Sequence, residues 1–381
     1  MDLDLPAYRE SSPRVNLTAL MASSPAQAPV TSVVLLINLA VFGLMLAFGA
    51  SVWHTTGSVP LAWGANFGPA TQDKQWWRLA TAMFVHFGFV HLALNMLALW
   101  DVGRLVERLH GRWRFGVLYA GSGVAGNLLS LAVQGNQAVS GGASGAVFGL
   151  YGALLVFLWR ERGQVERQEF RWMFGAAALF ATLALGMGQV VAGIDNAAHL
   201  GGLLAGALLG GALARPLTQR SPAPRRGWAI AGLSLAIGLL VLRMPEPSYL
   251  LADELRARDA IQQFLSTDQQ MRTQWRAILA QGRRQGVSFD DLAGSIETDI
   301  TPVYQHSFEQ LTAAYPGAVA PSANALEALQ AYASARAEAS LEAAQQLRSG
   351  DFQEINKALT RRPASLVVPA PMLSKPGVAG G

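Results

Sequence analysis

Cysteine is absent from this 381-residue chain. Disulfides, thiolate metal sites and a cysteine nucleophile are therefore excluded. Charged side chains are also scarce, at 14% of residues, whereas 51% of residues are hydrophobic. Residues 1–29 are polar and rich in Pro and Ser, so no signal peptide is evident, and we expect a flexible cytosolic lead. So little charge in so apolar a chain indicates a membrane protein.

Seven apolar runs follow the polar lead. A helix needs about 20 apolar residues to cross a bilayer, and six of the runs are long enough to predict transmembrane helices. They cover residues 30–50, 83–100, 115–133, 143–159, 172–191 and 197–214. A seventh run, at 228–242, is short but uncharged, and we expect it to span as well. The sequence thus predicts an all-α polytopic membrane protein with the lipid bilayer as its partner.

Arginines gather in alternate connections between these runs. The connections after the second, fourth and sixth runs hold Arg104, Arg108, Arg112, Arg114, Arg160, Arg162, Arg167, Arg171, Arg215, Arg220, Arg225 and Arg226. Cytosolic loops carry the excess of Lys and Arg, so the N-terminus is expected in the cytosol and the Ser144 end of the fourth run outside. The apolar part of the chain, before Met244, carries more basic than acidic residues. The same rule explains this excess, so no nucleic-acid partner is expected. The expected location is the inner membrane of a bacterium.

A glycine-rich turn opens the fourth run. Ser144 lies in it, directly between Gly142-Ala143 and Gly145. Glycine permits a tight backbone, and free N–H groups in a first helical turn can stabilise an oxyanion. A small-residue packing face with a capping serine would give the same pattern.

Polar residues interrupt two other runs. His199 lies in the sixth run, and His86 and the pair His91 and Asn95 lie in the second, with the pair on one helical face. Ionisable side chains are costly inside a bilayer and are therefore functional candidates. No His-Glu-x-x-His motif is present, which argues against a zinc site. A structural interhelical hydrogen bond remains an alternative role for Asn95.

Small residues predict how the fourth and sixth runs pack. Glycines are spaced along one face of each helix at Gly145, Gly149, Gly152, Gly202, Gly206 and Gly210. Such faces let membrane helices approach closely. This packing would bring His199 near Ser144 as a nucleophile and base, with Phe148 stacked on the imidazole. His91 and Asn95 could then donate to the oxyanion.

Together these residues resemble the rhomboid intramembrane serine proteases. The resemblance covers residues 30–214 and rests on Gly142-Ala143-Ser144-Gly145, Ala198-His199 with Gly202 and Gly206, His91-x-x-x-Asn95 after His86, and Trp77-Arg78. It implies a six-helix core, a Ser144–His199 dyad without an acidic third member, and oxyanion assistance from His91 and Asn95. Trp77-Arg78 is then expected in an interfacial loop.

The resemblance also implies a function. The expected activity is hydrolysis of peptide bonds in or near transmembrane segments of substrate proteins, in a cavity open to the outside and without a cofactor. Gly142, Phe148 and His86 are assigned to the substrate site. Phe148 departs from some bacterial relatives, which have tyrosine there, and only the stacking contact survives this change. Asp195 precedes His199 by four residues but is expected in the loop, not as a triad acid.

The resemblance ends before the C-terminal part. We expect a cytosolic linker and the seventh span at 215–243, an extracytoplasmic helical domain at 244–362, and a disordered Pro- and Gly-rich tail at 363–381. Amphipathic helices are expected at 249–266, 267–286, 290–315 and 323–359, with N-caps at Asp290 and Ser322 and an interruption at Pro302. His306 is alone there and predicts no site.

Two other functions remain open. A catalytically inactive rhomboid-like protein would bind membrane clients without cutting them. A proton-coupled transporter would use the histidines of the second and sixth runs as a path, but it would not need a serine in a glycine turn.

Overall fold

The computed structural model describes residues 14–22, 27–135, 138–218, 221, 226–282 and 286–350. These residues are mostly helical, and their only β-pairings are two isolated bridges. The chain divides into two compact units, the first running to Glu246 and the second starting at Pro247. The predicted disordered tail at 363–381 and most of the predicted lead lie outside the described residues.

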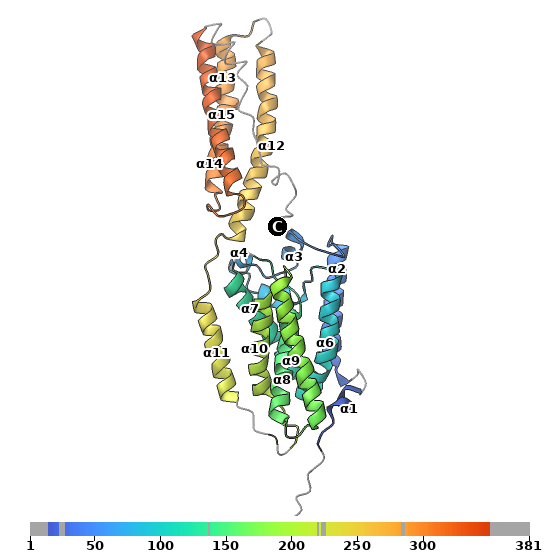
Figure 1. Ribbon diagram of the computed structural model, residues 1–381. Coiled ribbons are helices and arrows are strands. Elements are labelled where there is room, and N and C mark those ends of the chain that lie inside the picture. The colour runs from blue at the N-terminus through green and yellow to red at the C-terminus, as the bar shows by residue number, and fades with distance from the viewer. Residues whose placement is uncertain are drawn as a thin grey trace, which may run out of the picture. The chain divides into compact units, whose positions relative to one another are not determined.

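Eight helices of six or more residues belong to the described part of the first unit (Figure 1). They are α1 (Leu17–Ala22), α2 (Pro29–Ala47), α6 (Phe89–His110), α7 (Arg112–Gln134), α8 (Ser144–Glu161), α9 (Arg167–Val190), α10 (Asn196–Leu213) and α11 (Arg226–Leu242). Between α2 and α6 the chain forms short turns: α3 (Ser58–Ala62), α4 (Gly68–Thr71), α5 (Arg78–Thr81) and the 3-10 turn η2 (Ala82–Phe84).

Several of these helices can cross a membrane. Among the described residues, α2, α6, α7, α9 and α10 are long and apolar enough to do so. Helix α8 has 18 residues and ends in Arg160 and Glu161, while the apolar helix α11 has 17 residues. The protein is therefore a multi-pass helical membrane protein, as the sequence predicts.

The second span begins and ends later than its hydropathy indicates. Met83 lies in η2, the helix starts only at Phe89, and the Phe89 N–H donates to Val52 O at 2.7 Å. At the other end α6 continues to His110 and is followed by Gly111, whose φ of +86° lies in the left-handed region that glycine favours. Arg104 and Arg108 therefore lie in α6 and not in a connection. Arg104 covers the ring of Trp100 at 4.6 Å, so its charge is partly masked by an aromatic face.

Part of the predicted flexible lead is ordered. Leu17 opens α1 and is fully buried. Glu169 of α9 accepts hydrogen bonds from the N–H groups of Leu17 and Thr18, at 2.6 and 3.0 Å. A carboxylate at a helix start satisfies free N–H groups and complements the helix dipole. An acidic partner distant in sequence thus orders this segment.

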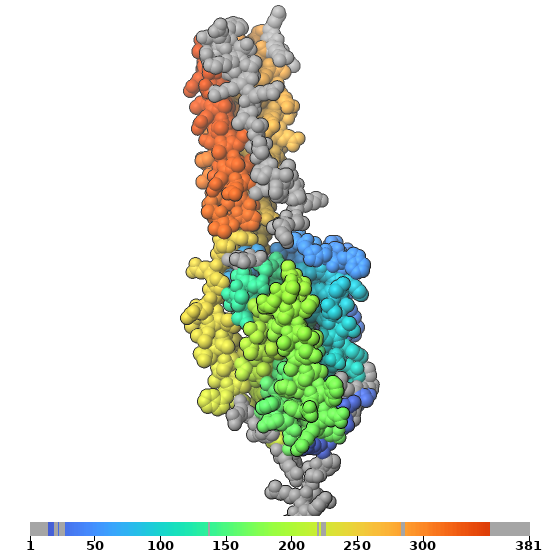
Figure 2. All heavy atoms as spheres, in the orientation of Figure 1, coloured from blue at the N-terminus to red at the C-terminus, as the bar shows by residue number. Residues whose placement is uncertain are grey.

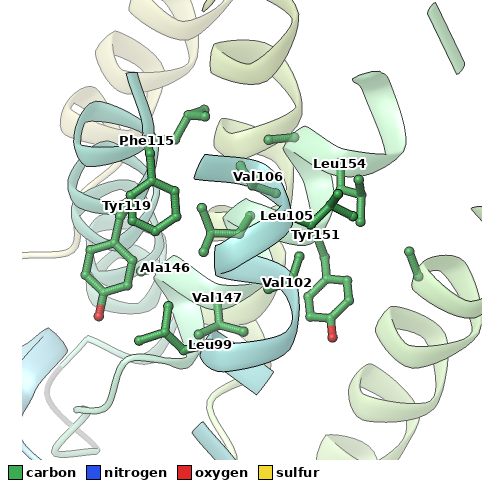
Figure 3. Close-up of a cluster of buried hydrophobic side chains, with 14 of the residues drawn as sticks. Leu99, Val102, Leu105, Val106, Phe115, Tyr119, Ala146, Val147, Tyr151 and Leu154 are labelled. Carbon is green, nitrogen blue, oxygen red and sulfur yellow. The ribbon is translucent and has the colours of Figure 1, made fainter. Parts of the chain in front are cut away.

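The apolar core of the first unit lies between α6, α7 and α8 (Figure 3). Leu99, Val106, Phe115 and Leu150 are fully buried in it. Helix α8 is apolar on all sides and is surrounded by α6, α7, α9 and α10. By contrast, α9 lies on the surface in Figure 2, and its Leu179, Leu183 and Met187 are exposed. The core therefore holds α8 firmly, whereas α9 presents apolar side chains where a bilayer would be.

The second unit is a helical bundle of α12 (Leu251–Gln281), α13 (Phe289–Asp299), α14 (Thr301–Ala313) and α15 (Ala323–Ser349). The sequence predicts two helices where α12 runs unbroken for 31 residues. No Gly or Pro interrupts residues 249–281, and Asp268 binds Tyr304 and Arg272 from within α12. Pro302 interrupts the third predicted segment, as expected, by standing in the first turn of α14.

The predicted N-caps of this bundle need correction. Helix α13 is capped by Ser288, whose hydroxyl accepts from the Asp291 N–H at 3.1 Å, so Asp290 stands inside the first turn. Ser322 precedes α15 as predicted, but its hydroxyl donates to buried Glu254 at 2.7 Å and caps no N–H. A distant carboxylate competes successfully for the serine hydroxyl.

Candidate active site

Helices α8 and α10 meet backbone to backbone. A Cβ added at Gly202 would overlap the carbonyl of Gly145, and one at Gly206 would overlap Gly149. A Cβ at Gly210 would come within 2.7 Å of Ala153. We call this contact the α8–α10 seam. It follows the spacing of small residues in the two runs, as small-xxx-small faces predict.

The seam brings the segments of Ser144 and His199 together. Gly145 follows the serine and Ala198 precedes the histidine, and a Cβ on Gly145 would be 3.3 Å from the Ala198 carbonyl oxygen. Ser144 is half-buried as the first residue of α8, and His199 is 8% exposed. The starts of α8 and α10, which are far apart in the sequence, thus lie side by side at Gly145 and Ala198.

The imidazole of His199 is held by an aromatic face. Its ring and that of Phe148 stack with centroids 4.2 Å apart and planes 10° from parallel. Phe148 in turn contacts Phe180 of α9, with centroids 6.0 Å apart. His199 Nδ1 is buried and has no hydrogen-bond partner among the described residues. No carboxylate therefore contacts that nitrogen in the described part of the chain.

The turn before Ser144 is tightly packed. Gly142 has φ +117°, and a Cβ there would be 2.7 Å from the His91 ring. Its N–H donates to Ala82 O at 2.8 Å, so this group is already used. The hydrogen bond from Val147 N–H to Ala143 O is the one that starts α8, so the N–H groups of Ser144 and Gly145 lie before the helical ladder.

Helix α6 places His91 beside this turn. Its ring Nδ1 accepts from the Phe87 N–H at 3.4 Å, and the two rings stack with centroids 5.9 Å apart. Asn95 is buried one helical turn away and donates to the His91 carbonyl at 2.9 Å. The amide of Asn95 has a second N–H, so this bond leaves it a donor.

His86 lies next to His91. The two imidazole centroids are 5.1 Å apart, and His86 is fully buried. Its Nδ1 is 3.3 Å from the Phe84 carbonyl, and its Nε2 is buried without a partner among the described residues. The rings of His86 and His91 are thus within contact distance of each other.

The first long loop is fixed to the same turn. Asn66 and Ser140 exchange both backbone hydrogen bonds at 2.8 Å as an antiparallel bridge. Arg78 is buried and donates to the carbonyls of Leu61 and Ala65, and its guanidinium covers the Trp77 ring at 4.7 Å. The Trp77-Arg78 pair thus organises the loop internally, with Trp77 itself exposed.

Asp195 lies in the loop directly before α10, as expected, and its side chain has several partners there. It is the N-cap of α10, and its Oδ1 accepts from the Ala198 N–H at 2.9 Å and from Gln134 at 2.6 Å. Its Oδ2 accepts from the hydroxyls of Ser130 and Ser140, each at 2.5 Å. The cap could have been found, because Asp before an apolar run is an N-cap signal. The partners Ser130 and Gln134 are four residues apart in α7 and mark one polar helical face.

Metal binding has no support in this part of the chain. Within the described ranges, no three His, Asp or Glu side chains are grouped as metal ligands would be. The arrangement instead offers a hydroxyl, an imidazole and several N–H donors, which is the set required for acyl transfer.

Comparison with known proteins gives a consistent result. A Rhomboid domain profile matches residues 73–216. The chain is 35% identical over 189 residues to the rhomboid protease GluP of Bacillus subtilis, covering 50% of this chain but only 36% of GluP. It is 38% identical over 146 residues to YdcA of the same organism, also named as a rhomboid protein, covering 38% of this chain and 70% of YdcA.

A more distant relative comes from another bacterium. The rhomboid protease AarA of Providencia stuartii is 29% identical over 201 residues, covering 47% of this chain and 70% of AarA. The profile match includes the turn of Ser144, the helix of His199 and the polar face of α6, and it ends before α11. The second unit lies outside it.

Proposed function

Because the chain belongs to the rhomboid family, we propose that it is an intramembrane serine endopeptidase that hydrolyses peptide bonds in or near the transmembrane segments of other membrane proteins. The observation that carries the proposal is the seam, which joins Gly145 to Ala198 and stacks Phe148 on His199. Ser144 and His199 then belong to two helices that are packed directly against each other along this seam.

In the proposed mechanism His199 accepts the hydroxyl proton of Ser144 while the serine oxygen attacks the scissile carbonyl carbon. The tetrahedral intermediate collapses, and the imidazolium returns the proton to the departing amine. Water then attacks the acyl carbon while His199 takes its proton; as the ester bond to Ser144 breaks, His199 returns that proton to the serine oxygen, and the carboxylic acid is released. Phe148 holds the imidazole plane throughout.

The oxyanion is proposed to lie at the start of α8. The Ser144 and Gly145 N–H groups precede the helical ladder there, the helix dipole favours negative charge, and His91 stands beside Gly142. The second N–H of Asn95 is a further donor. Gly142 is proposed to contribute space for His91, since its own N–H is bound to Ala82. His86 is proposed to support His91.

A fluorophosphonate probe tests the dyad directly. It should label the purified wild type, and both Ser144→Ala and His199→Ala should abolish labelling and cleavage of a model transmembrane substrate. The double variant should be little worse than either single one, because nucleophile and base act as a unit. His306→Ala is the matched control, because this exposed histidine of α14 lies in the second unit and should leave labelling unchanged.

The rival functions give different results. A client-binding protein without activity would bind transmembrane segments but remain unlabelled. A proton-coupled transporter would show gradient-dependent flux that survives Ser144→Ala. Labelling that persists in Ser144→Ala would reject the nucleophile assignment.

A further inference from the structure

A single carboxylate contacts both segments that carry the proposed dyad. Asp195 is four residues before His199, and its partner Ser140 is four residues before Ser144. The Ser140 hydroxyl donates to Asp195 Oδ2 at 2.5 Å. The carbonyl of Asp195 also accepts from the His199 N–H at 3.1 Å.

Helix α7 holds this carboxylate from the other side. Ser130 donates to Oδ2 at 2.5 Å and Gln134 to Oδ1 at 2.6 Å, one helical turn apart. With the Ala198 N–H, the carboxylate accepts four hydrogen bonds, two on each oxygen. A carboxylate with both oxygens used in this way is fixed in position and in rotation.

Ser140 links the Asp195 carboxylate to the turn that carries Ser144. Ser140 is buried, its backbone pairs with Asn66 of the first loop, and two residues later Gly142 binds Ala82. The turn of Ser144 is thus held at its far end by Asp195 and nearer the serine by Ala82. On the α10 side, the cap sets where the first turn begins and hence which way His199 points.

We propose that Asp195 is a positioning residue, which ties the turn of Ser144 to the first turn of α10 and anchors both on α7. The inference rests on the proposed function, and it gives Asp195 no part in proton transfer. The four groups that donate hydrogen bonds to the Asp195 carboxylate do not include the ring of His199.

The test compares Asp195→Ala with Asp195→Asn in the full-length protein. Alanine removes every bond of the carboxylate. Asparagine keeps a good N-cap and one acceptor, and the serine hydroxyls can rotate to accept from its amide. We expect Asp195→Ala to slow fluorophosphonate labelling by about 10²-fold, the usual effect of a misplaced reacting group. Asp195→Asn should recover most of that loss, and substrate KM should change less than kcat.

We call the hydrogen bond between Ser140 and Asp195 the tether. The variant Ser140→Ala separates the effect of this tether from that of the helix cap. It removes the bond to the nucleophile turn and leaves the bond to the Ala198 N–H intact. If the tether operates, Ser140→Ala slows labelling, and adding it to Asp195→Ala causes little further loss, because the two residues share one interaction. Asp101→Ala, which changes an exposed carboxylate of α6, is the matched control and should label at the wild-type rate.

Amide hydrogen exchange supplies a readout that needs no activity. In Asp195→Ala, exchange should become faster both in residues 138–146 and in the first turn of α10. Faster exchange in α10 alone would mean that Asp195 is only a helix cap and would overturn the proposal. Unchanged labelling of Asp195→Ala would overturn it too. If the wild-type protein is not labelled, the proposed function is rejected instead. The exchange pattern then still shows whether Asp195 connects the turn of Ser144 to α10.

Discussion

His91 lies beside Gly142, just before α8, and Asn95 lies one helical turn further along α6. We expect both to act on the reaction and not as ordinary interhelical contacts. The Asn95 hydrogen bond in the structure is local, to the carbonyl one turn back. Truncation of Asn95 therefore removes none of the side-chain hydrogen bonds that the structure shows between helices. If the second N–H of Asn95 donates to the oxyanion, loss of this side chain should lower the rate of substrate cleavage.

We expect His91→Ala and Asn95→Ala each to lower turnover by on the order of 10²–10³, with a much smaller change in thermal stability. The measurement is kcat on a transmembrane substrate beside a detergent melting curve. A variant that melts early but has normal activity per folded molecule would show that the residue only supports the fold.

At the level of single residues, sequence reasoning succeeded where one helical face decides the contact. The stack of Phe148 on His199 follows from the glycine spacing alone. The N-cap of Asp195 is readable from the sequence, but its bonds to Ser130 and Ser140 could not be foreseen, because they depend on how the loop after α7 returns. The local bond of Asn95 was also missed, since side-chain rotamers are not encoded by periodicity.

At the level of helices, the seam is the contact on which the site depends. A Cβ on Gly206 would overlap the Gly149 carbonyl, and neither backbone can move without moving its helix. We expect Gly206→Ala to lower the melting temperature and to reduce labelling by at least about 10-fold, because the helices must separate.

Gly175→Ala is the matched control for this substitution. It also lies within a membrane helix, α9, but a Cβ there meets nothing within 4 Å. Equal activity of Gly206→Ala and the wild type would mean that the seam can widen without disturbing the site.

The length and composition of α11 indicate whether it crosses the membrane. Its 17 residues are about 26 Å long at 1.5 Å per residue, against a hydrocarbon core of about 30 Å. None of its residues is buried in the protein, and its apolar side chains face outward on several sides. Spanning suits such a helix better than lying at the interface, which would require a polar face.

We therefore expect residues after α11 to be periplasmic. Alkaline phosphatase fused after Ser266 should be active and green fluorescent protein dark. A fusion after Leu217 should give the opposite pattern and serves as the control. A fluorescent Ser266 fusion would place α11 on the membrane surface and leave the proposed dyad unaffected.

The helix positions themselves were largely predictable, because hydropathy marks where each apolar run lies. The ends were not. The start of α6 depends on a bond from Phe89 to Val52, and its end depends on Gly111 in a left-handed conformation. Likewise α12 continues through Asp268 because partners on α14 and α15 satisfy its carboxylate.

At the level of the whole molecule, the two units have separate cores. The core residues of the first unit all precede Met244, and those of the second lie between Ala257 and Leu347. The second unit has its own buried polar contacts, in which Asp268 accepts from Tyr304 at 2.8 Å and Tyr332 at 3.1 Å. Neither core needs side chains from the other.

A chain truncated after Glu246 should therefore still cleave a generic transmembrane substrate, at a rate within about 3-fold of the full-length protein, and should melt at a similar temperature. Ser144→Ala in the truncated chain is the negative control. A truncated protein that folds normally but does not cleave would give the second unit a direct part in the reaction.

The seam also has a consequence for when the proposed dyad can form during synthesis of the chain. Ser144 enters the bilayer with α8, but the partner surface that completes its surroundings belongs to α10, which is translated after α9. Because the contact is made of backbone on both sides, no flexible side chain can substitute for the missing helix. If the proposed dyad operates, a nascent chain released before α10 has been inserted would carry the serine without its base and would be inactive.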